Sequence, residues 1–406
     1  ASDGRRITLG WTAGRLTSVS ANGRTWSYAY NAQGTSLTSV TLPDQRSWAI
    51  NLQPLTGATI DFARGDPRSC SSPSVVLGPT SLIGSVTHPS GVVGQFEIGW
   101  RRLGRSNVPQ ACANWEFPVN DPNNDVAFFV RDIDVLPLLR KTVSGPSITS
   151  HQWNYAYGST RSWAPGTGPV CNTPTCADPV CLNDSCAGNT VVTVTGPDGE
   201  WQRYRFGNSY RYNEGKLLEV QRGNSETDVL ETEAITYNLS QSGQPFATPV
   251  GTSLRARGDG FADAYLRPRS QSIVTRQGTT FTWQATAFDA FARVTAETHS
   301  SSLGHTRNVT QSFEDRPGPW VVGLPCIRTV NGLAERDLRY NTAALVEHEY
   351  RFGERRVSFG YRADGTIETV TDGRNFVTTA NDWKRGLPQE VVYPLATGVR
   401  RATVDD

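Results

Sequence analysis

The stretch of residues 11–52 constrains the fold more than any other part of the sequence, because nearly the same unit occurs in it twice. Leu16 and Leu37 are 21 residues apart, and the same spacing separates Val19 from Val40. Self-similarity at such a period indicates small supersecondary units that bury their apolar faces only against neighbouring copies. We therefore expect a repeat array, for which a length of 406 residues does not set the number of domains.

Each unit has the sequence pattern of a β-hairpin. Aromatic residues alternate with small ones in residues 26–30, which is the period of a half-buried strand. Residues 31–34, Asn-Ala-Gln-Gly, follow as a turn with Asn first and Gly where a left-handed backbone is needed. The next apolar residues, Leu37 and Val40, are three positions apart rather than two, which predicts a β-bulge after the glycine.

Further copies of the unit occur downstream. Residues 212–220 and 361–374 repeat the turn and the strand that follows it. Residues 288–295 form a degenerate copy in which Ala292 stands in place of glycine, which predicts either a strained backbone or a different turn. The glycines expected at the repeat turns are Gly14, Gly34, Gly215 and Gly365.

The unit follows the pattern Tyr-Asp-x-x-Gly-Arg-Leu-x-x-Val, best in residues 14–19 and 361–370, whereas Asn replaces Asp after Tyr30 and Tyr212. This pattern resembles the YD repeat of bacterial Rhs proteins, of the C component of insecticidal toxin complexes, and of teneurins. The resemblance implies an all-β fold whose hairpins form a continuous twisted, spiralling antiparallel sheet, a partial β-shell. It also implies that the shell encloses a C-terminal toxin or effector polypeptide, a structural role that needs no catalytic residue and no cofactor.

The repeats suggest three regions along the chain. We expect YD-type repeats in residues 1–52, divergent repeats with insertions in residues 53–190, and YD-type repeats again in residues 191–406. Residues 4–9 read as the second half of a turn and strand, and the sequence has no methionine. We therefore expect a piece of a longer polypeptide, or alternatively a mature chain left after signal cleavage.

The composition bears on whether the partner is a nucleic acid or a membrane. The net charge is +1 and the 39 basic residues form no Lys/Arg run, so a nucleic-acid partner is not expected. No apolar run approaches the length of a membrane-spanning helix, so no membrane span is expected. The 11 tryptophans, 13 tyrosines and 38 glycines suit strands joined by tight turns.

Four of the seven cysteines form a regular array with four residues between successive members, in a loop rich in Pro, Asn, Asp and Thr. We expect two local disulfides in this loop, with three connectivities open. A tetrahedral zinc site is the alternative, although the spacing lacks the usual C-x2-C element, and a redox role is a third. The array is Cys171, Cys176, Cys181 and Cys186; Cys70 and Cys112 are expected to pair with each other, leaving Cys326 over.

If these disulfides form, the protein matures in an oxidising compartment, so we expect a secreted or cell-surface bacterial protein. Its expected partner is the remainder of its own precursor or an enclosed toxin domain. An extracellular adhesin or self-associating surface module that binds a cell-surface glycan is the alternative. Tryptophans that could stack on sugar rings in that case are Trp115, Trp153, Trp163 and Trp320.

Catalytic motifs are absent from the sequence: it contains no hydrolase nucleophile elbow, phosphate-binding loop, zinc-protease helix or dinucleotide-binding glycine motif. We therefore expect no enzymatic activity. The third hypothesis, a glycan-active enzyme, would need two carboxylates facing a common cleft. The acidic group that could supply them is Glu214, Glu219, Glu226, Asp228, Glu231 and Glu233, and the scattered histidines are His88, His151, His299, His305 and His348.

Overall fold

A computed structural model describes the chain over nine ranges. These are residues 6–61, 75–108, 131–164, 188–210, 212–240, 242–246, 266–384, 386–394 and 400–401. The chain divides into two compact units, Arg5–Thr280 and Phe281–Asp406 together with Ala1–Gly4. Each unit is described by itself.

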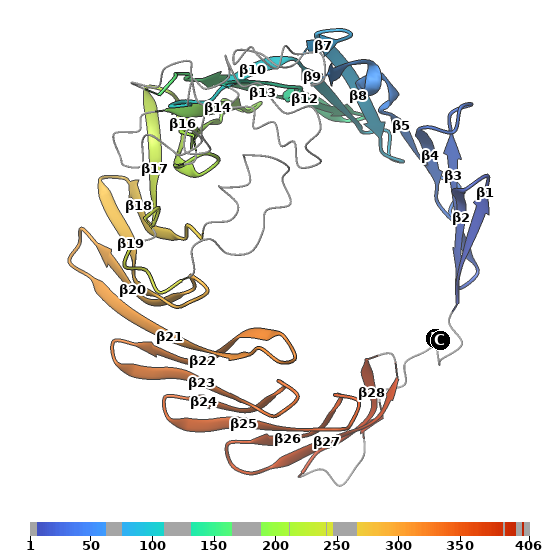
Figure 1. Cartoon of the computed structure of the whole chain (residues 1–406). Coiled ribbons are helices and arrows are strands. Elements are labelled where there is room, and N and C mark those ends of the chain that lie inside the picture. Colours follow the sequence, from blue (N-terminus) through green and yellow to red (C-terminus); the bar gives the residue numbers. More distant parts are fainter. Residues whose placement is uncertain are drawn as a thin grey trace, which may run out of the picture. The chain divides into compact units, whose positions relative to one another are not determined.

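In the first unit each strand of the main sheet pairs antiparallel with the next one along the chain. The strands β1 to β5 in Figure 1 form successive hairpins of this kind. The strands are β1 (Ile7–Thr12), β2 (Arg15–Ala21), β3 (Arg24–Tyr30), β4 (Leu37–Thr41), β5 (Ser47–Asn51), β8 (Ser81–Thr87), β9 (Val93–Gly99), β12 (Leu138–Gly145), β13 (Ile148–Ser159), β14 (Asn189–Thr195), β15 (Trp201–Gly207), β16 (Leu217–Ser225), β17 (Asp228–Tyr237) and β18 (Arg269–Arg276).

Shorter elements interrupt this order. A 3-10 helix, η1 (Gln53–Gly57), follows β5. Strands β6 (Thr59–Asp61) and β7 (Val75–Leu77) pair with each other, and so do β10 (Arg101–Gly104) and β11 (Asp132–Val135). They fall in the region where the sequence predicted insertions between divergent repeats.

The second unit continues the same local pattern, with each strand antiparallel to the next. Figure 1 shows β20 to β28 as adjacent hairpins in orange and red. The strands are β19 (Thr279–Phe288), β20 (Val294–Ser301), β21 (Thr306–Arg316), β22 (Val321–Val330), β23 (Leu333–Tyr340), β24 (Val346–Arg351), β25 (Glu354–Tyr361), β26 (Ile367–Asp372), β27 (Val377–Lys384), β28 (Leu387–Val392) and β29 (Arg400–Arg401).

The predicted all-β fold, made of antiparallel hairpins in a long sheet, is confirmed. Most strand side chains are half-buried whichever way they point, as in β4 and β20, where every residue is intermediate. Few side chains are fully buried; in the second unit the buried apolar ones described are Ala285, Val309, Leu338 and Ala380. Stability must therefore come largely from contacts between neighbouring strands.

A β-bulge follows the turn in the first repeat. Ala29 pairs with Ser39 whereas Tyr30 pairs with Leu37, so Thr38 is the extra residue. The hairpin of β25 and β26 has the same register shift at Tyr361. The bulge explains why the apolar residues Leu37 and Val40 are three positions apart.

Candidate functional site

Several turns between strands, including those that begin at His88, Asp289, Asn341 and Arg362, share one hydrogen-bond pattern. In the turn between β23 and β24, the Asn341 N–H donates to the Leu345 carbonyl at 2.9 Å, and the Ala344 N–H donates to the Asn341 carbonyl at 3.0 Å. The Asn341 side-chain oxygen also accepts from the N–H groups of Ala343 and Leu345, both at 3.0 Å. The side chain at the first turn position therefore holds the loop in shape, which explains the preference for Asn or Asp there.

Each of the predicted turn glycines has a left-handed backbone. The φ values at the glycines expected in the turns are 74° for Gly14, 66° for Gly34, 76° for Gly215 and 84° for Gly365. Ala292 keeps the same turn, with a φ of 58° and an N–H that donates to the Asp289 carbonyl at 3.0 Å. Of the two outcomes expected for this alanine, the structure shows the strained backbone.

Arg293 links its own turn to strand β21. Its Nε donates to Asp289 at 2.6 Å, and its two terminal nitrogens donate to Asp315 at 2.8 and 2.7 Å. The guanidinium also lies 4.4 Å from the centre of the Phe313 ring. Hydrogen bonds from Arg293 and from the Gly323 N–H lower the pKa of Asp315 to about 2. The Asp and Arg of the repeat pattern therefore form a charged link between neighbouring repeats.

Within the described ranges, five aromatic side chains near strand ends donate to the backbone of the preceding strand. The Tyr30 hydroxyl at the end of β3 donates to the Leu16 carbonyl on β2 at 3.0 Å, and the Tyr361 hydroxyl on β25 donates to the Val346 carbonyl on β24 at 2.7 Å. Burial raises the pKa of Tyr361, which keeps the hydroxyl protonated. The other three pairs are Tyr157 to Leu138 at 2.7 Å, Tyr340 to Pro325 at 2.8 Å, and the Trp383 indole N–H to Ile367 at 2.8 Å.

These aromatic-to-backbone hydrogen bonds were not predicted from the sequence. Leu16, Val346 and Ile367 each lie beside a register shift, where the ladder is interrupted. A side-chain donor can satisfy a backbone carbonyl at such a place. The tyrosine of the repeat pattern was the available signal, but its acceptor is a backbone group that any residue could provide.

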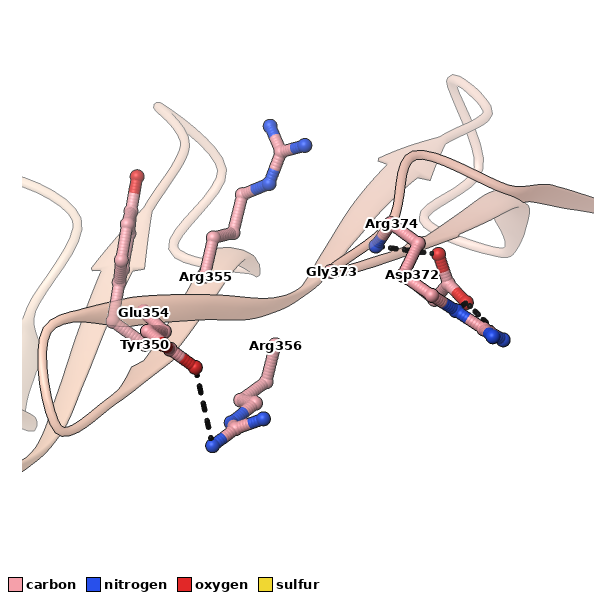
Figure 2. A pocket seen from close by; sticks show the side chains of 7 residues that line it. All are labelled: Tyr350, Glu354, Arg355, Arg356, Asp372, Gly373 and Arg374. Carbon is pink, nitrogen blue, oxygen red and sulfur yellow. Dashed lines mark hydrogen bonds and ion pairs between the residues drawn. The ribbon is translucent and has the colours of Figure 1, made fainter.

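A surface depression lies between the turn of β24–β25 and the turn after β26 (Figure 2). Arg356 pairs with Glu354 at 3.5 Å, and Arg374 pairs with Asp372 at 3.3 Å. Hydrogen bonds from the Phe376 N–H and from Arg374 lower the pKa of Asp372. Figure 2 shows Arg355 on the opposite side of the ribbon from Arg356. Paired charges of this kind form a polar surface.

The acidic group proposed for a glycan-active enzyme is distributed over both faces of its strands. Glu219 pairs with Ala234 and Val220 pairs with Glu233 across β16 and β17, so the two glutamates point to opposite faces. Burial opposes ionisation of Glu233, but hydrogen bonds from Ser272 and Arg269 outweigh it and lower its pKa. A glycosidase acid needs a raised pKa.

The same carboxylates are paired with arginines on neighbouring segments. The pairs are Glu214 with Arg105 at 2.5 Å, Glu219 with Arg205 at 3.3 Å, Glu226 with Arg203 at 2.5 Å, Glu231 with Arg222 at 2.5 Å, and Glu233 with Arg269; Asp228 accepts from Asn224 at 2.8 Å. Cross-strand ion pairs explain this group better than paired catalytic carboxylates do.

A buried polar cluster joins two segments of the first unit that are far apart in sequence. Arg105 is 4% exposed, donates to both carboxylate oxygens of Glu214 at 2.5 and 2.9 Å, and lies 4.9 Å from the ring centre of Tyr210. The Asn208 amide donates to the Gly104 carbonyl at 2.8 Å. Because its charges and amides satisfy one another, we interpret this cluster as structural.

The remaining predicted site residues divide between described and undescribed parts of the chain. Cys70, Cys112 and the array from Cys171 to Cys186 lie outside the described residues. Cys326 is free and half-buried, and burial raises the pKa of its thiol. Within the described ranges, no group of three His, Cys, Asp or Glu side chains could hold a metal ion. Nor does any helix in that part of the chain have the length and apolar character to cross a membrane.

The tryptophans considered for sugar stacking differ in their surroundings. Trp115 lies outside the described residues. Lys141 lies over Trp153 at 4.3 Å from the ring centre, and Arg131 lies over Trp163 at 4.7 Å. Trp320 is 74% exposed at a turn, with a φ of 55°. Of the three that are described, Trp320 alone presents an open ring.

Residues 10–48 match the family model of the RHS repeat. This stretch of the chain is similar to an RHS repeat. The match covers the duplicated unit from which the repeat pattern was derived, and the same turn geometry recurs in the second unit. The tyrosine, the turn Asn or Asp and the left-handed residue of the RHS pattern therefore have defined structural roles.

Solved structures similar to this chain include complexes of TcdB2 and TccC3. The crystal structure of TcdB2-TccC3-Cdc42 has 11% identity and a TM-score of 0.35, covering 91% of this chain and 16% of that one. TcdB2-TccC3 without the hypervariable C-terminal region has 8% identity and a TM-score of 0.35, with coverage of 95% and 18%. The chain thus spans less than a fifth of the length of these structures. No curated protein matches its sequence.

Proposed function

We propose that this chain is a wall segment of a larger, secreted or surface-exposed Rhs-like protein, and that the wall encloses a C-terminal toxin or effector polypeptide. The observation that carries the proposal is the succession of antiparallel hairpins in each unit, joined to one another through turns and aromatic-to-backbone hydrogen bonds. Such a sheet can separate a polypeptide from water and proteases without any catalytic group.

The bonding of the sheet supports a passive role. The tyrosine hydroxyls, the turn carboxylates and Arg293 are all used to join one repeat to the next. A wall built in this way resists local opening, because breaking one contact leaves a polar group near the sheet without its partner. This rigidity is what protection of an unfolded cargo would need.

Limited proteolysis of the protein isolated from its natural source tests the proposal. We expect a companion polypeptide, or a further segment of the same precursor, to resist protease until the wall is destabilised. Leu338→Ala, which weakens the sheet, should make that segment cleavable at protease doses that spare it in the unaltered protein. Enclosure would be contradicted if the segment is cleaved at the same rate in the unaltered protein and in Leu338→Ala, or if no such segment is found.

A second candidate function is adhesion to a surface glycan, which the open ring of Trp320 favours. Glycan binding by the chain should then fall at least tenfold in Trp320→Ala and persist in Trp153→Phe, since Trp153 already has Lys141 over its ring. Binding that is unchanged in Trp320→Ala would remove this candidate.

A further inference from the structure

Turns in the second unit lie alternately at the two ends of its strands, because each strand runs antiparallel to the next (Figure 1). The turns that follow β20, β22, β24 and β26 therefore share one end of the strands. We call this end the arginine edge, and its segments are residues 301–307, 330–336, 351–356 and 372–376. The turns that follow β19, β21, β23 and β25 form the opposite edge, with residues 288–294, 314–321, 340–346 and 361–367.

The two edges differ in charge. These segments of the arginine edge contain six arginines and three carboxylates, whereas those of the opposite edge contain three arginines and four carboxylates. Arg355, on the arginine edge, donates to the neutral amide oxygen of Asn375, so this contact leaves its charge uncompensated. An anionic surface is therefore attracted more strongly to the arginine edge than to the opposite one.

Three apolar side chains at the arginine edge are largely exposed. Leu303 lies in the turn after β20, Leu333 begins β23, and Phe352 lies in the turn after β24. They are 65%, 66% and 64% exposed. Each belongs to a different hairpin, so a protein partner would need a separate pocket for each one. A lipid surface can take up several separate apolar side chains at once.

Phe352 is strained as well as exposed. Its φ is 52°, in the left-handed region that bulky side chains rarely adopt. It precedes Gly353 in a two-residue turn that the pairing of Arg351 with Glu354 closes. In the other described turns where a left-handed residue precedes a left-handed glycine, that residue is small or polar: Ala13, Asn22, Gln277 and Asn331. Phenylalanine favours neither the turn nor a core here, which points to a contact outside the chain.

A depression of about 780 Å³ lies between the turns that follow β24 and β26 (Figure 2). Three arginines and two carboxylates line it, and the lining residues Tyr350 and Glu354 flank Phe352 in the sequence. The side chains of Arg356 and Arg374 pair with carboxylates but stay 56% and 79% exposed, so a ligand can reach them. An excess of guanidinium groups in a concave site suits a phosphate group.

We propose that the arginine edge docks on a bilayer that contains anionic phospholipid. Leu303, Leu333 and Phe352 insert among the lipid headgroups, and the arginines of the depression contact the lipid phosphates. Both contributions are needed, because a few apolar side chains or a few charges alone bind a membrane only marginally. The inference goes beyond the proposed role as a wall segment and does not depend on whether a polypeptide is enclosed.

Co-sedimentation of the full 406-residue chain with lipid vesicles tests this inference. The probes are vesicles of phosphatidylcholine alone and vesicles in which phosphatidylserine makes up about a quarter of the lipid. We expect binding only to the vesicles with phosphatidylserine. Because salt shortens the Debye length from about 10 Å at 0.1 M to about 3 Å at 1 M, added salt should weaken this binding.

Phe352→Asn should weaken binding to the phosphatidylserine vesicles about tenfold, because it removes the aromatic ring from the edge. Asparagine suits a left-handed position, as Asn331 shows, so this variant should remain folded. Arg355→Gln should weaken binding about fivefold, the effect of one charge near an anionic surface.

Two variants serve as controls. Phe352→Leu keeps an apolar side chain at the edge and should retain most of the binding. Trp320→Ala, which removes a 74% exposed aromatic side chain from the opposite edge, should leave binding unchanged. Circular dichroism confirms that each variant is folded.

Four results would overturn the proposal. The first is equal binding, or none, to the two kinds of vesicle, and the second is equal binding by Phe352→Asn and the unaltered chain. The third is binding of soluble glycerophosphoserine as tight as that of the vesicles, which would assign the depression to a free phosphate. The fourth is a dimer of the chain that is lost in Phe352→Asn, which would assign the edge to a second copy.

Discussion

Arg293 connects neighbouring repeats through charge. It donates to Asp289 in its own turn and to Asp315 on β21, and the pKa of Asp315 is lowered to about 2. An Asp with a lowered folded pKa contributes stability above its unfolded value, near 3.8, and loses that contribution as pH falls through about 2. The link is therefore intact at neutral pH and breaks only in acid.

We predict that the denaturant midpoint of the second unit falls between pH 4 and pH 2 more steeply in the unaltered chain than in Asp315→Asn. The difference between the two curves isolates Asp315 from the other carboxylates. Glu368→Gln, which removes an exposed carboxylate with no ion pair among the described residues, should follow the unaltered curve. Parallel curves for Asp315→Asn and the unaltered chain would contradict the account.

The tyrosine of the repeat pattern acts through its hydroxyl. Tyr361→Phe removes the 2.7 Å hydrogen bond to the Val346 carbonyl while keeping the ring, so we predict a loss of about 1 kcal/mol in the free energy of unfolding. Tyr350→Phe is the control, because the ring of Tyr350 packs under Arg339 and would remain there. Equal losses in the two variants, measured by urea unfolding, would show that the hydroxyl bond contributes nothing specific.

Ala292 and Ala344 have left-handed backbones, with φ values of 58° and 62°. Glycine adopts this conformation without steric strain, so Ala292→Gly and Ala344→Gly should each stabilise the unit by about 0.5–1 kcal/mol. Ala343→Gly, in the same turn as Ala344 but without a positive φ, should be neutral or slightly destabilising. The midpoints of thermal unfolding of the three variants measure these changes. Destabilisation by all three substitutions would contradict the prediction that the left-handed backbones of Ala292 and Ala344 are strained.

For single residues, the sequence predicted the left-handed turn positions but not which backbone carbonyls accept hydrogen bonds from the aromatic side chains. Gly34 and Gly365 could be predicted because a left-handed residue has a compositional signature. The bonds from Tyr30 and Trp383 could not, because their acceptors are backbone carbonyls with no signature of their own. The Arg105 cluster was also missed, since Arg105 and Glu214 are separated by 109 positions.

Hairpins are the elements from which the stability of each unit is built. Leu338 on β23 is 5% exposed and lies opposite Glu349 on β24, in a sheet with few other buried side chains. We predict that Leu338→Ala destabilises the second unit by about 2–4 kcal/mol, because it removes buried contacts that the sheet cannot replace.

The exposed Leu333 on the same strand provides the control, since it is 66% exposed. Leu333→Ala should change stability by less than about 0.5 kcal/mol. If urea unfolding shows similar losses of stability for the two variants, the side chains of Leu338 and Leu333 do not differ in burial as described.

Strand periodicity was recognisable wherever aromatic residues alternate, as in residues 26–30. The bulges could be anticipated from a three-residue spacing such as that of Leu37 and Val40. Short elements such as η1 and β10 could not, because they contain no period and depend on contacts with distant segments. The predicted boundaries after residues 52 and 190 stay predictions.

For the whole molecule, the RHS match covers residues 10–48, and similar antiparallel hairpins recur in the described parts of both units. In such an array each hairpin depends on its neighbours for burial of its apolar residues. The paired carboxylates of β16 and β17 agree with this view, since they are engaged in ion pairs between strands.

The mass of the natural protein, measured first under native and then under denaturing conditions, tests the proposed wall most directly. We predict a native mass larger than that of the 406-residue chain, made up of this segment and an enclosed polypeptide that is released or revealed on denaturation. A native species containing only this chain, alone or in copies of itself, would contradict enclosure.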